Sequence, residues 1–166
     1  MDLGINGRKA IVCASSRGLG KACAISLARN GVHVTLNSRD ESVLATTAQE
    51  IRHLAPDIDV ITVAGNVSDP QCQQALLDAT PGADILINNN GGPPFRDFRE
   101  LDREAMTEGV TMNMITPIEM INGVIDDMSA RGFGRIVNIT SISVKKPVLG
   151  LRSEERRVGK ECRSRW

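Results

Sequence analysis

The stretch CASSRGLG, residues 13–20, combines small residues with a basic side chain in a pattern that could hold a phosphate group. Phosphate binds where helix N–H groups point outward and no side-chain bulk blocks the approach. Gly18 and Gly20 leave room for that approach and for tight packing of the following helix, and Arg17 can reach a phosphate directly. Ala14 stands where a first glycine is usual, and the turn can tolerate the added methyl group if φ is negative there. The alternative is that both glycines serve packing alone.

A second candidate position follows the next apolar segment, at Ser38 and Arg39. In a dinucleotide-binding fold, an NAD site places a carboxylate here for the ribose 2′-hydroxyl. No acid stands at Ser38, and the Arg39 guanidinium matches the geometry of a 2′-phosphate. With Arg17 nearby, the charges favour NADP (NADPH). The alternative is that both arginines are solvated surface residues.

The elements that must position these residues alternate along the chain. Apolar segments predict strands at 9–14, 33–37, 59–65, 84–89 and 134–141. Helical composition predicts crossovers at 18–31, 41–54, 68–80 and much of 102–131, with Asp40 and Asp69 as N-caps. Such crossovers enforce parallel pairing, and continuous apolar strands indicate a sheet covered on both faces. The sequence therefore predicts an α/β, doubly wound (Rossmann-type) parallel sheet in strand order 3-2-1-4-5.

Five stretches, in chain order, carry a resemblance to a known family. The spacing of Ala14, Gly18 and Gly20 resembles the TGxxxGxG turn of the short-chain dehydrogenases/reductases, with Cys13 and Ala14 in place of Thr-Gly. GNVSD, INNNGG, MNMI and RIVNITSIS resemble that family's later motifs, although INNNGG has Asn90 where the family has alanine. The resemblance, which covers roughly residues 5–150, is to the 3-oxoacyl-[acyl-carrier-protein] reductase type.

The resemblance implies roles for particular residues. Asn113 corresponds to the catalytic asparagine, which bends its helix and holds a water. Ser141 corresponds to the catalytic serine, with Thr140 and Ser143 as alternatives, and Asn88 is expected to have a structural role. The residues expected to bind the cofactor are Ala14, Ser16, Arg17, Gly18, Leu19, Gly20, Ser38, Arg39, Asn66, Val67, Asn89 and Gly91.

The family also uses a Tyr-x-x-x-Lys pair, in which the tyrosine is the general acid. This chain contains no tyrosine, and the expected position carries Glu154. The tail RSEERRVGKECRSRW, residues 152–166, resembles the in-frame translation of a sequencing-library adapter. We therefore expect a partial domain at 1–151, with the sheet truncated after its fifth strand, and an artefactual tail at 152–166. The chain as written should be inactive as a carbonyl reductase.

Composition excludes several classes of function. The tail holds six basic and three acidic residues, which leaves 14 basic and 17 acidic residues in the body and no electrostatic basis for binding nucleic acid or an anionic membrane. The four cysteines form no CxxC pair, so we expect reduced thiols and no metal site. No apolar stretch could span a bilayer, and the amino terminus does not read as a signal peptide, so we expect a cytoplasmic protein.

Taken together, these features predict that the intact parent protein is an NADP-dependent oxidoreductase. The resemblance implies reduction of a carbonyl, such as that of a 3-oxoacyl thioester or related ketone, by a homo-oligomer. Two alternatives stay open. The parent could be a non-catalytic dinucleotide-binding or sensing protein, or the chain could be an inert truncated product.

Overall fold

The computed structural model describes residues 3–91 and 101–141 of the chain. Five strands form one parallel sheet in the order β3-β2-β1-β4-β5. The strands are β1 (Lys9–Val12), β2 (His33–Ser38), β3 (Val60–Ala64), β4 (Ile85–Asn88) and β5 (Arg135–Asn138). The predicted doubly wound fold and its strand order are confirmed, and the described part of the chain ends just after the fifth strand.

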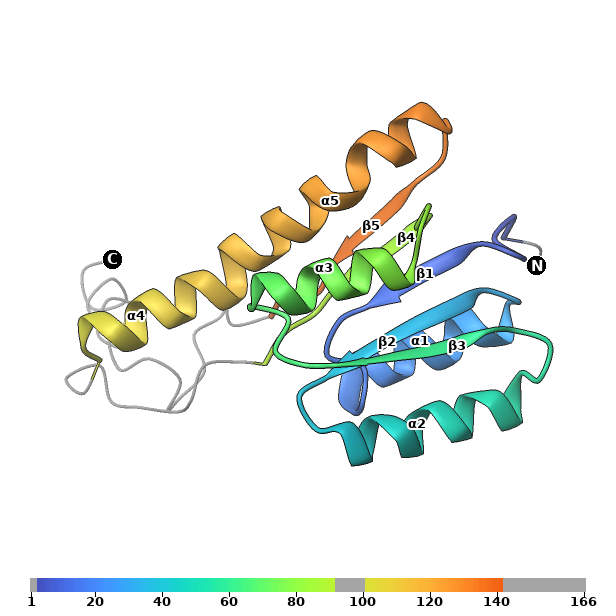
Figure 1. Ribbon diagram of the computed structural model, residues 1–166, viewed down its shortest axis with the longest axis horizontal. Coiled ribbons are helices and arrows are strands. Elements are labelled where there is room, and N and C mark those ends of the chain that lie inside the picture. Colours follow the sequence, from blue (N-terminus) through green and yellow to red (C-terminus); the bar gives the residue numbers. More distant parts are fainter. Residues whose placement is uncertain (1–2, 92–100, 142–166) are drawn as a thin grey trace, which may run out of the picture.

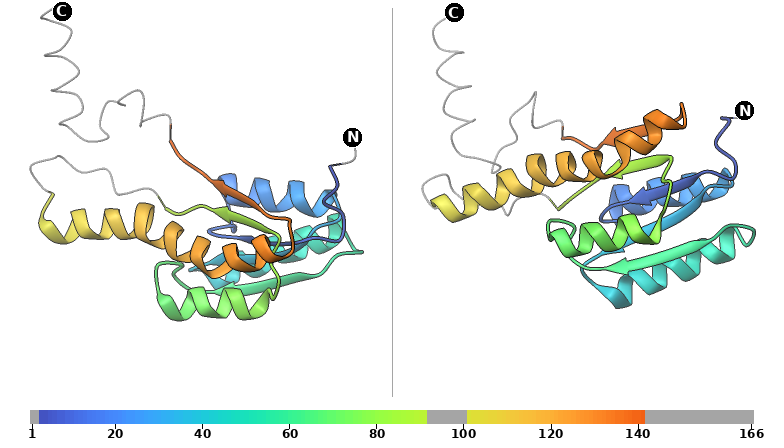
Figure 2. Two further views of the ribbon diagram at one scale, coloured as in Figure 1. Left: turned by 90° about the horizontal axis from the view of Figure 1, so that it is seen from above. Right: turned by 45° about the horizontal axis from the view of Figure 1, so that its top comes forward.

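Helices cover both faces of this sheet (Figure 1, Figure 2). On one face, α1 (Gly18–Arg29) and α2 (Glu41–Leu54) pack on alternate residues of β1, β2 and β4. On the other face, α3 (Pro70–Ala79) and α5 (Thr116–Ala130) pack on the intervening residues. β1 is therefore apolar on both faces, as a sheet buried on both sides requires, whereas β2 and β4 also bury the polar residues Thr35, Asn37 and Asn88.

Local capping explains where most helices begin. Asp40 accepts a hydrogen bond from Val43 N at the start of α2, and Asp69 does the same from Gln71 N at the start of α3. α4 (Arg103–Val110) is capped in the same way by Asp102. In contrast, α1 has no side-chain cap at its N-terminus. Its first N–H groups therefore lack the acceptor that the other three helices have.

The fourth crossover is a helix with an irregular turn in its middle, whereas the sequence predicted one long helix. A π-helical turn, η2 (Thr111–Ile115), separates α4 from α5. Pro117 follows it and lacks an N–H group, so the ordinary four-residue ladder cannot continue across this point. The predicted bend at Asn113 therefore takes the form of a π turn.

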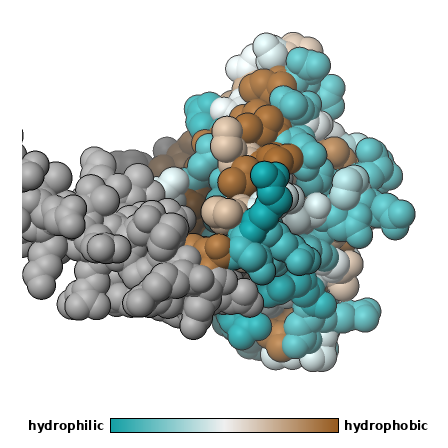
Figure 3. Space-filling view, turned by 90° about the vertical axis from the view of Figure 1, so that its left-hand side faces the viewer, coloured by the Kyte–Doolittle hydropathy of each residue, from teal (hydrophilic) through white to brown (hydrophobic). Residues whose placement is uncertain are grey.

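The two edge strands are less covered than the central strands. Ile61 of β3 is 42% exposed and Val137 of β5 is 45% exposed. Within the described residues, β5 pairs only with β4, so its outer edge has no neighbouring strand there. A band of hydrophobic side chains also runs up the face shown in Figure 3. The exposed large apolar residues of α4, η2 and α5 are Met106, Val110, Met114, Ile115, Ile118 and Ile125.

Charged side chains at the amino ends of the strands are paired. Asp84 accepts a hydrogen bond from Lys9 N at 3.2 Å, and its other oxygen lies 3.4 Å from Arg8 Nη1 and 3.7 Å from Arg131 Nη2. The guanidinium groups of Arg8 and Arg135 lie over the Phe133 ring, at 3.9 and 4.6 Å from its centroid. This group of residues, the Asp84 cluster, connects β1, β4 and β5.

None of the helices in the described ranges is both long and apolar enough to cross a membrane.

Candidate functional site: a cleft at the carboxyl edge of the sheet

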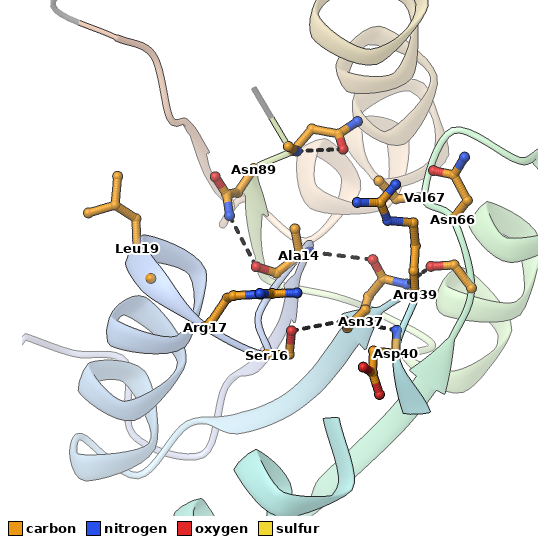
Figure 4. Close-up of a pocket in the computed structure, with 15 residues that line it drawn as sticks. Ala14, Ser16, Arg17, Leu19, Asn37, Arg39, Asp40, Asn66, Val67 and Asn89 are labelled. Atoms are coloured by element: carbon orange, nitrogen blue, oxygen red, sulfur yellow. Dashed lines mark hydrogen bonds between the residues drawn. The ribbon is translucent and has the colours of Figure 1, made fainter. Parts of the chain in front are cut away.

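A cleft of about 690 Å³ opens where β1, β2, β3 and β4 end (Figure 4). Eleven of the twelve predicted cofactor-binding residues line it, and the twelfth, Gly20, lies beneath. The lining residues are Ala14, Ser16, Arg17, Gly18, Leu19, Asn37, Ser38, Arg39, Asp40, Gly65, Asn66, Val67, Asn89, Asn90 and Gly91. The parallel topology brings these residues together because all four strands end at the same edge.

Gly20 is buried under the β1–α1 turn, which comprises residues 13–17. A Cβ at Gly20 would overlap the Ala14 carbonyl oxygen and lie 2.9 Å from Asn89 Nδ2. Gly18 differs, since it has a φ of +59° and open space on its Cβ side. Gly20 therefore provides close packing, whereas Gly18 provides a backbone conformation that favours glycine.

Ala14 does not meet the condition under which alanine was expected to fit the turn. Its φ is 46° rather than negative, so it adopts the left-handed conformation. Two asparagines hold it there: Ala14 N donates to Asn37 Oδ1 at 3.4 Å, and Asn89 Nδ2 donates to the Ala14 carbonyl at 3.2 Å (Figure 4). These contacts fix the turn in the conformation that a glycine would adopt more readily.

Asn37 is a site residue that sequence reasoning missed. Its side chain is 1% exposed, and its Nδ2 donates to the carbonyls of Val63 and Gly65 at 3.1 and 3.2 Å. Its backbone exchanges hydrogen bonds with Ser15. It therefore ties the ends of β1, β2 and β3 together. The signal was available, because a buried strand seldom ends in a carboxamide that has no partner.

The charge of the cleft comes from two guanidinium groups. Arg17 at the start of α1 and Arg39 after β2 both line it (Figure 4). Across the residues that the structure describes, neither side chain makes an ion pair or a hydrogen bond within the protein. Asp40 is also present, but it is occupied as the cap of α2. Its pKa is lowered chiefly by the Val43 N–H, then by the Ser42 hydroxyl, with a smaller contribution from Arg17. The cleft thus offers an anion two uncommitted cations beside an uncapped helix N-terminus.

Ser38 stands where a carboxylate would discriminate against a 2′-phosphate. Its hydroxyl lies 2.8 Å from the Ser16 hydroxyl, and Thr47 donates to the Ser16 carbonyl at 2.9 Å. The β1–α1 turn and the end of β2 are therefore joined by neutral groups. No acidic side chain replaces the missing carboxylate at this position, and Arg39 is the next residue.

A row of asparagines lies deeper, beside the π turn. Asn88 Nδ2 donates to Asn138 Oδ1 at 2.9 Å, which is the structural role expected of it. Asn113 lines a small cavity of about 30 Å³ together with Asn88, Asn89 and Asn90. The Asn113 side chain donates to the Gly109 carbonyl at 2.9 Å. A cavity of this size and polarity can hold an ordered water.

Ser141 lies just beyond β5 and is exposed, and it is not among the residues that line the small cavity with Asn113. Thr140 precedes it. The third candidate, Ser143, lies outside the described residues, as do Glu154 and the tail at 152–166. The structure therefore brings the predicted cofactor-binding residues together at one cleft, and Asn113 lines the small cavity.

The cysteines near the cleft are buried. Burial raises the pKa of the Cys13 thiol to about 12, and burial also raises the pKa of Cys72. Asn37 Nδ2 approaches Cys72 Sγ at 3.4 Å. No group of three or more potential metal ligands occurs in the two described ranges.

The five-stranded parallel sheet has the strand order of a doubly wound dinucleotide-binding fold, and sequence comparison identifies its family. Residues 8–153 match the short chain dehydrogenase family, and the chain belongs to that family. It is 30% identical over 142 residues to L-xylulose reductase from Mesocricetus auratus, covering 85% of this chain and 56% of that protein. It is 31% identical over 144 residues to the NADPH-dependent reductase BacG of Bacillus subtilis, covering 84% of this chain and 56% of the relative.

Solved structures agree with this assignment. L-sorbose reductase from Gluconobacter frateurii, solved in complex with NADPH and L-sorbose, superimposes with a TM-score of 0.85 and 29% identity. The superposition covers 91% of this chain and 59% of that structure. The chain thus spans somewhat more than half the length of the relatives it matches, and the family is one of oxidoreductase enzymes.

Proposed function

We propose that the intact parent of this chain is an NADPH-dependent carbonyl reductase and that the cleft is its NADPH site. The observation that carries the proposal is the pair of uncommitted guanidinium groups, Arg17 and Arg39, in a cleft with no carboxylate at Ser38. A 2′-phosphate would satisfy the charge of Arg39, whereas a ribose 2′-hydroxyl would leave it without a partner.

The remaining cleft residues fit the rest of the dinucleotide. The uncapped N-terminus of α1, with Gly18 and Leu19, would hold the pyrophosphate. Asn66 and Val67 would contact the adenine, and Asn89 and Gly91 would lie toward the nicotinamide-side ribose. Bound NADPH would supply the hydride for carbonyl reduction.

The catalytic roles follow the family pattern. The Ser141 hydroxyl would donate a hydrogen bond to the substrate carbonyl oxygen, and Asn113 would hold a water beside it. The general acid would come from a Tyr-x-x-x-Lys pair in the parent, because this chain has no tyrosine. The chain as written is therefore expected to be inactive as a carbonyl reductase.

The substrate is a small-molecule ketone, either a 3-oxoacyl thioester or another carbonyl compound. The relatives with the names L-xylulose reductase and L-sorbose reductase add a keto-sugar to the candidates. The parent would work in the cytoplasm as a homo-oligomer. The exposed apolar side chains of α4 and α5 support the oligomer, because apolar surface of this kind is usually covered.

A second candidate is a non-catalytic NADP-binding or sensing protein. The departures of this chain from the family's motifs at Cys13-Ala14 and in INNNGG favour it. The two functions make opposite predictions for the parent sequence beyond Leu151: a Tyr-x-x-x-Lys in frame belongs to the enzyme, and its absence to the sensor.

The test is NADPH oxidation by the intact parent, followed at about 340 nm, where the reduced nicotinamide absorbs. The substrates are an acetoacetyl thioester, L-xylulose, L-sorbose and a simple ketone. Turnover that Ser141→Ala reduces by about 10²-fold or more supports the reductase. NADPH binding without turnover of any of these substrates would favour the sensor instead.

A further inference from the structure

The π turn leaves one backbone carbonyl without a helical partner. Thr116 N donates to the Thr111 carbonyl, five residues earlier. The next donor in that series would be residue 117, and its acceptor would be the Met112 carbonyl. Residue 117 is proline, which has no N–H group. A carbonyl beside the cleft therefore needs a partner from elsewhere.

Asn90 supplies that partner. Its Nδ2 donates to the Met112 carbonyl at 3.1 Å, across 22 residues of sequence. Its Oδ1 accepts from Gly91 N at 2.8 Å, which sets the orientation of the carboxamide. The donor group therefore faces the helix, and the side chain lies between the large cleft and the small cavity that Asn113 lines.

Ser68 extends the same connection to the third strand. Its hydroxyl oxygen is 3.3 Å from Asn90 Nδ2 and accepts from Thr116 Oγ1 at 3.0 Å. Ser68 directly follows Val67, which lines the cleft. The hydrogen bonds thus join the cleft wall, the end of β4 and the π turn in one short path.

We propose that Asn90 is a positioning residue that replaces the hydrogen bond Pro117 cannot make, and so holds the π turn that carries Asn113 against the cleft. The assignment of Asn113 to the site rests on the proposed function, whereas the pairing of Asn90 with Pro117 rests on the contacts alone. The consequence is specific: Asn90 matters only while residue 117 lacks an N–H.

The experiment is a double-mutant cycle on the full 166-residue chain without dinucleotide, read out as amide hydrogen exchange by NMR. Asn90→Ala should accelerate exchange of the Thr116 amide about tenfold relative to the amides of α1, because an unsatisfied carbonyl destabilises the turn. In the Pro117→Ala background, the new N–H at position 117 can reach the Met112 carbonyl, and the same substitution should then change exchange less than about twofold.

Two further variants sharpen the result. Asn90→Asp keeps the acceptor for Gly91 N but removes both donors, so it should match Asn90→Ala and also serves if the alanine variant does not fold. Ser68→Ala leaves the hydrogen bond from Asn90 to the Met112 carbonyl intact. Any change that Ser68→Ala causes in exchange of the Thr116 amide should therefore be the same in the Pro117→Ala background. Equal acceleration by Asn90→Ala in both backgrounds, or none in either, would overturn the proposal.

An NADPH titration of the unmutated intact parent keeps the two claims separate. Failure to bind NADPH would count against the proposed function. The exchange cycle, which contains no dinucleotide, would still decide whether Asn90 supports the π turn.

Discussion

At the amino edge of the sheet, charged groups are paired, whereas at the carboxyl edge two guanidinium groups are left uncommitted. Asp84 meets Arg8 and Arg131 at the amino edge. At the carboxyl edge, Arg17 and Arg39 line a cleft whose one acidic lining residue, Asp40, caps α2. The difference indicates that the first edge stabilises the fold and that the second is prepared for an anion that comes from outside.

The two edges also differ in how they use backbone conformation. At the amino edge, the left-handed residues before the strands are glycines such as Gly7, Gly31 and Gly82, whereas the carboxyl edge includes a left-handed alanine and a π turn. Irregular backbone of this kind persists where surrounding contacts hold it in place, and it gathers at functional sites. The following substitutions test whether stability and binding separate between the edges in this way.

The largest effect is expected for Gly20→Ala at the carboxyl edge. Its new Cβ would overlap the Ala14 carbonyl, which belongs to the backbone and cannot move aside. We expect a loss of about 3 kcal/mol in the free energy of unfolding, together with loss of measurable NADPH binding. Gly18→Ala is the matched control, since it meets no atom and should cost about 1 kcal/mol through its positive φ alone. Urea unfolding measures both variants, and equal losses would contradict this account of the turn.

Asp84→Ala should destabilise the fold at the amino edge without altering the preference for NADPH over NADH. The carboxylate is only 10% exposed, while its arginine partners are more than a third exposed and can be solvated when it is removed. We therefore expect a loss of about 2 kcal/mol in unfolding free energy, mainly from the unpaired Lys9 N–H and the lost ion pairs. The preference of the intact protein for NADPH over NADH should stay unchanged. A shift in that preference would show that the two edges are not independent.

The buried thiol of Cys13 should make the carboxyl edge sensitive to alkaline pH. Its pKa is raised to about 12 in the folded chain, against 9.0 as the ordinary value. The unfolded chain therefore loses this proton first as pH rises above 9, so the stability contribution is complete below that pH and is lost toward pH 12. Between pH 8 and pH 10 the unfolding free energy should fall by about 1.4 kcal/mol more in the unmutated chain than in Cys13→Ala. Parallel pH profiles for the two chains would contradict this prediction.

The smallest effect is expected for Ala14→Gly. Glycine would relieve the left-handed conformation, which costs alanine about 1 kcal/mol, but it would also add entropy to the unfolded chain. The net stabilisation should be about 0.5 kcal/mol or less. Since Asn37 and Asn89 bind only backbone atoms of this residue, their hydrogen bonds should persist. Thermal melting measures the change, and a clear loss of stability would show that the alanine methyl group makes a favourable contact.

Much of the fold could be predicted from the sequence because its signals are local. Apolar runs separated by helices of adequate length fix a parallel sheet, and Asp40 and Asp69 mark helix starts by their own chemistry. The positive φ of Ala14 could not be predicted, because it depends on Asn37 and Asn89, which come from other strands. The predicted strand order already places the third and fifth strands at the edges, but the exposure of Ile61 and Val137 depends on how far other elements cover those strands, and apolar patterning does not report that.

The site divides in the same way. The residue types at Arg17, Ser38 and Arg39 indicated a phosphate site, because the charge of each side chain follows directly from the sequence. The role of Asn37 was missed because its contacts join three strands. The link from Asn90 to the Met112 carbonyl depends on a π turn that no local pattern specifies.

The most direct test of the central claim is a fluorescence titration of the intact protein with NADPH and NADH, repeated with Arg39→Ala. The account predicts that the unmutated protein binds NADPH at least about tenfold more tightly, since a charge-assisted contact to the 2′-phosphate contributes about 1.5–3 kcal/mol before solvent exposure reduces it. Arg39→Ala should bring the two affinities together by weakening NADPH binding alone. Equal affinities in the unmutated protein would contradict the claim that the uncommitted arginines of the carboxyl edge form a site for a 2′-phosphate.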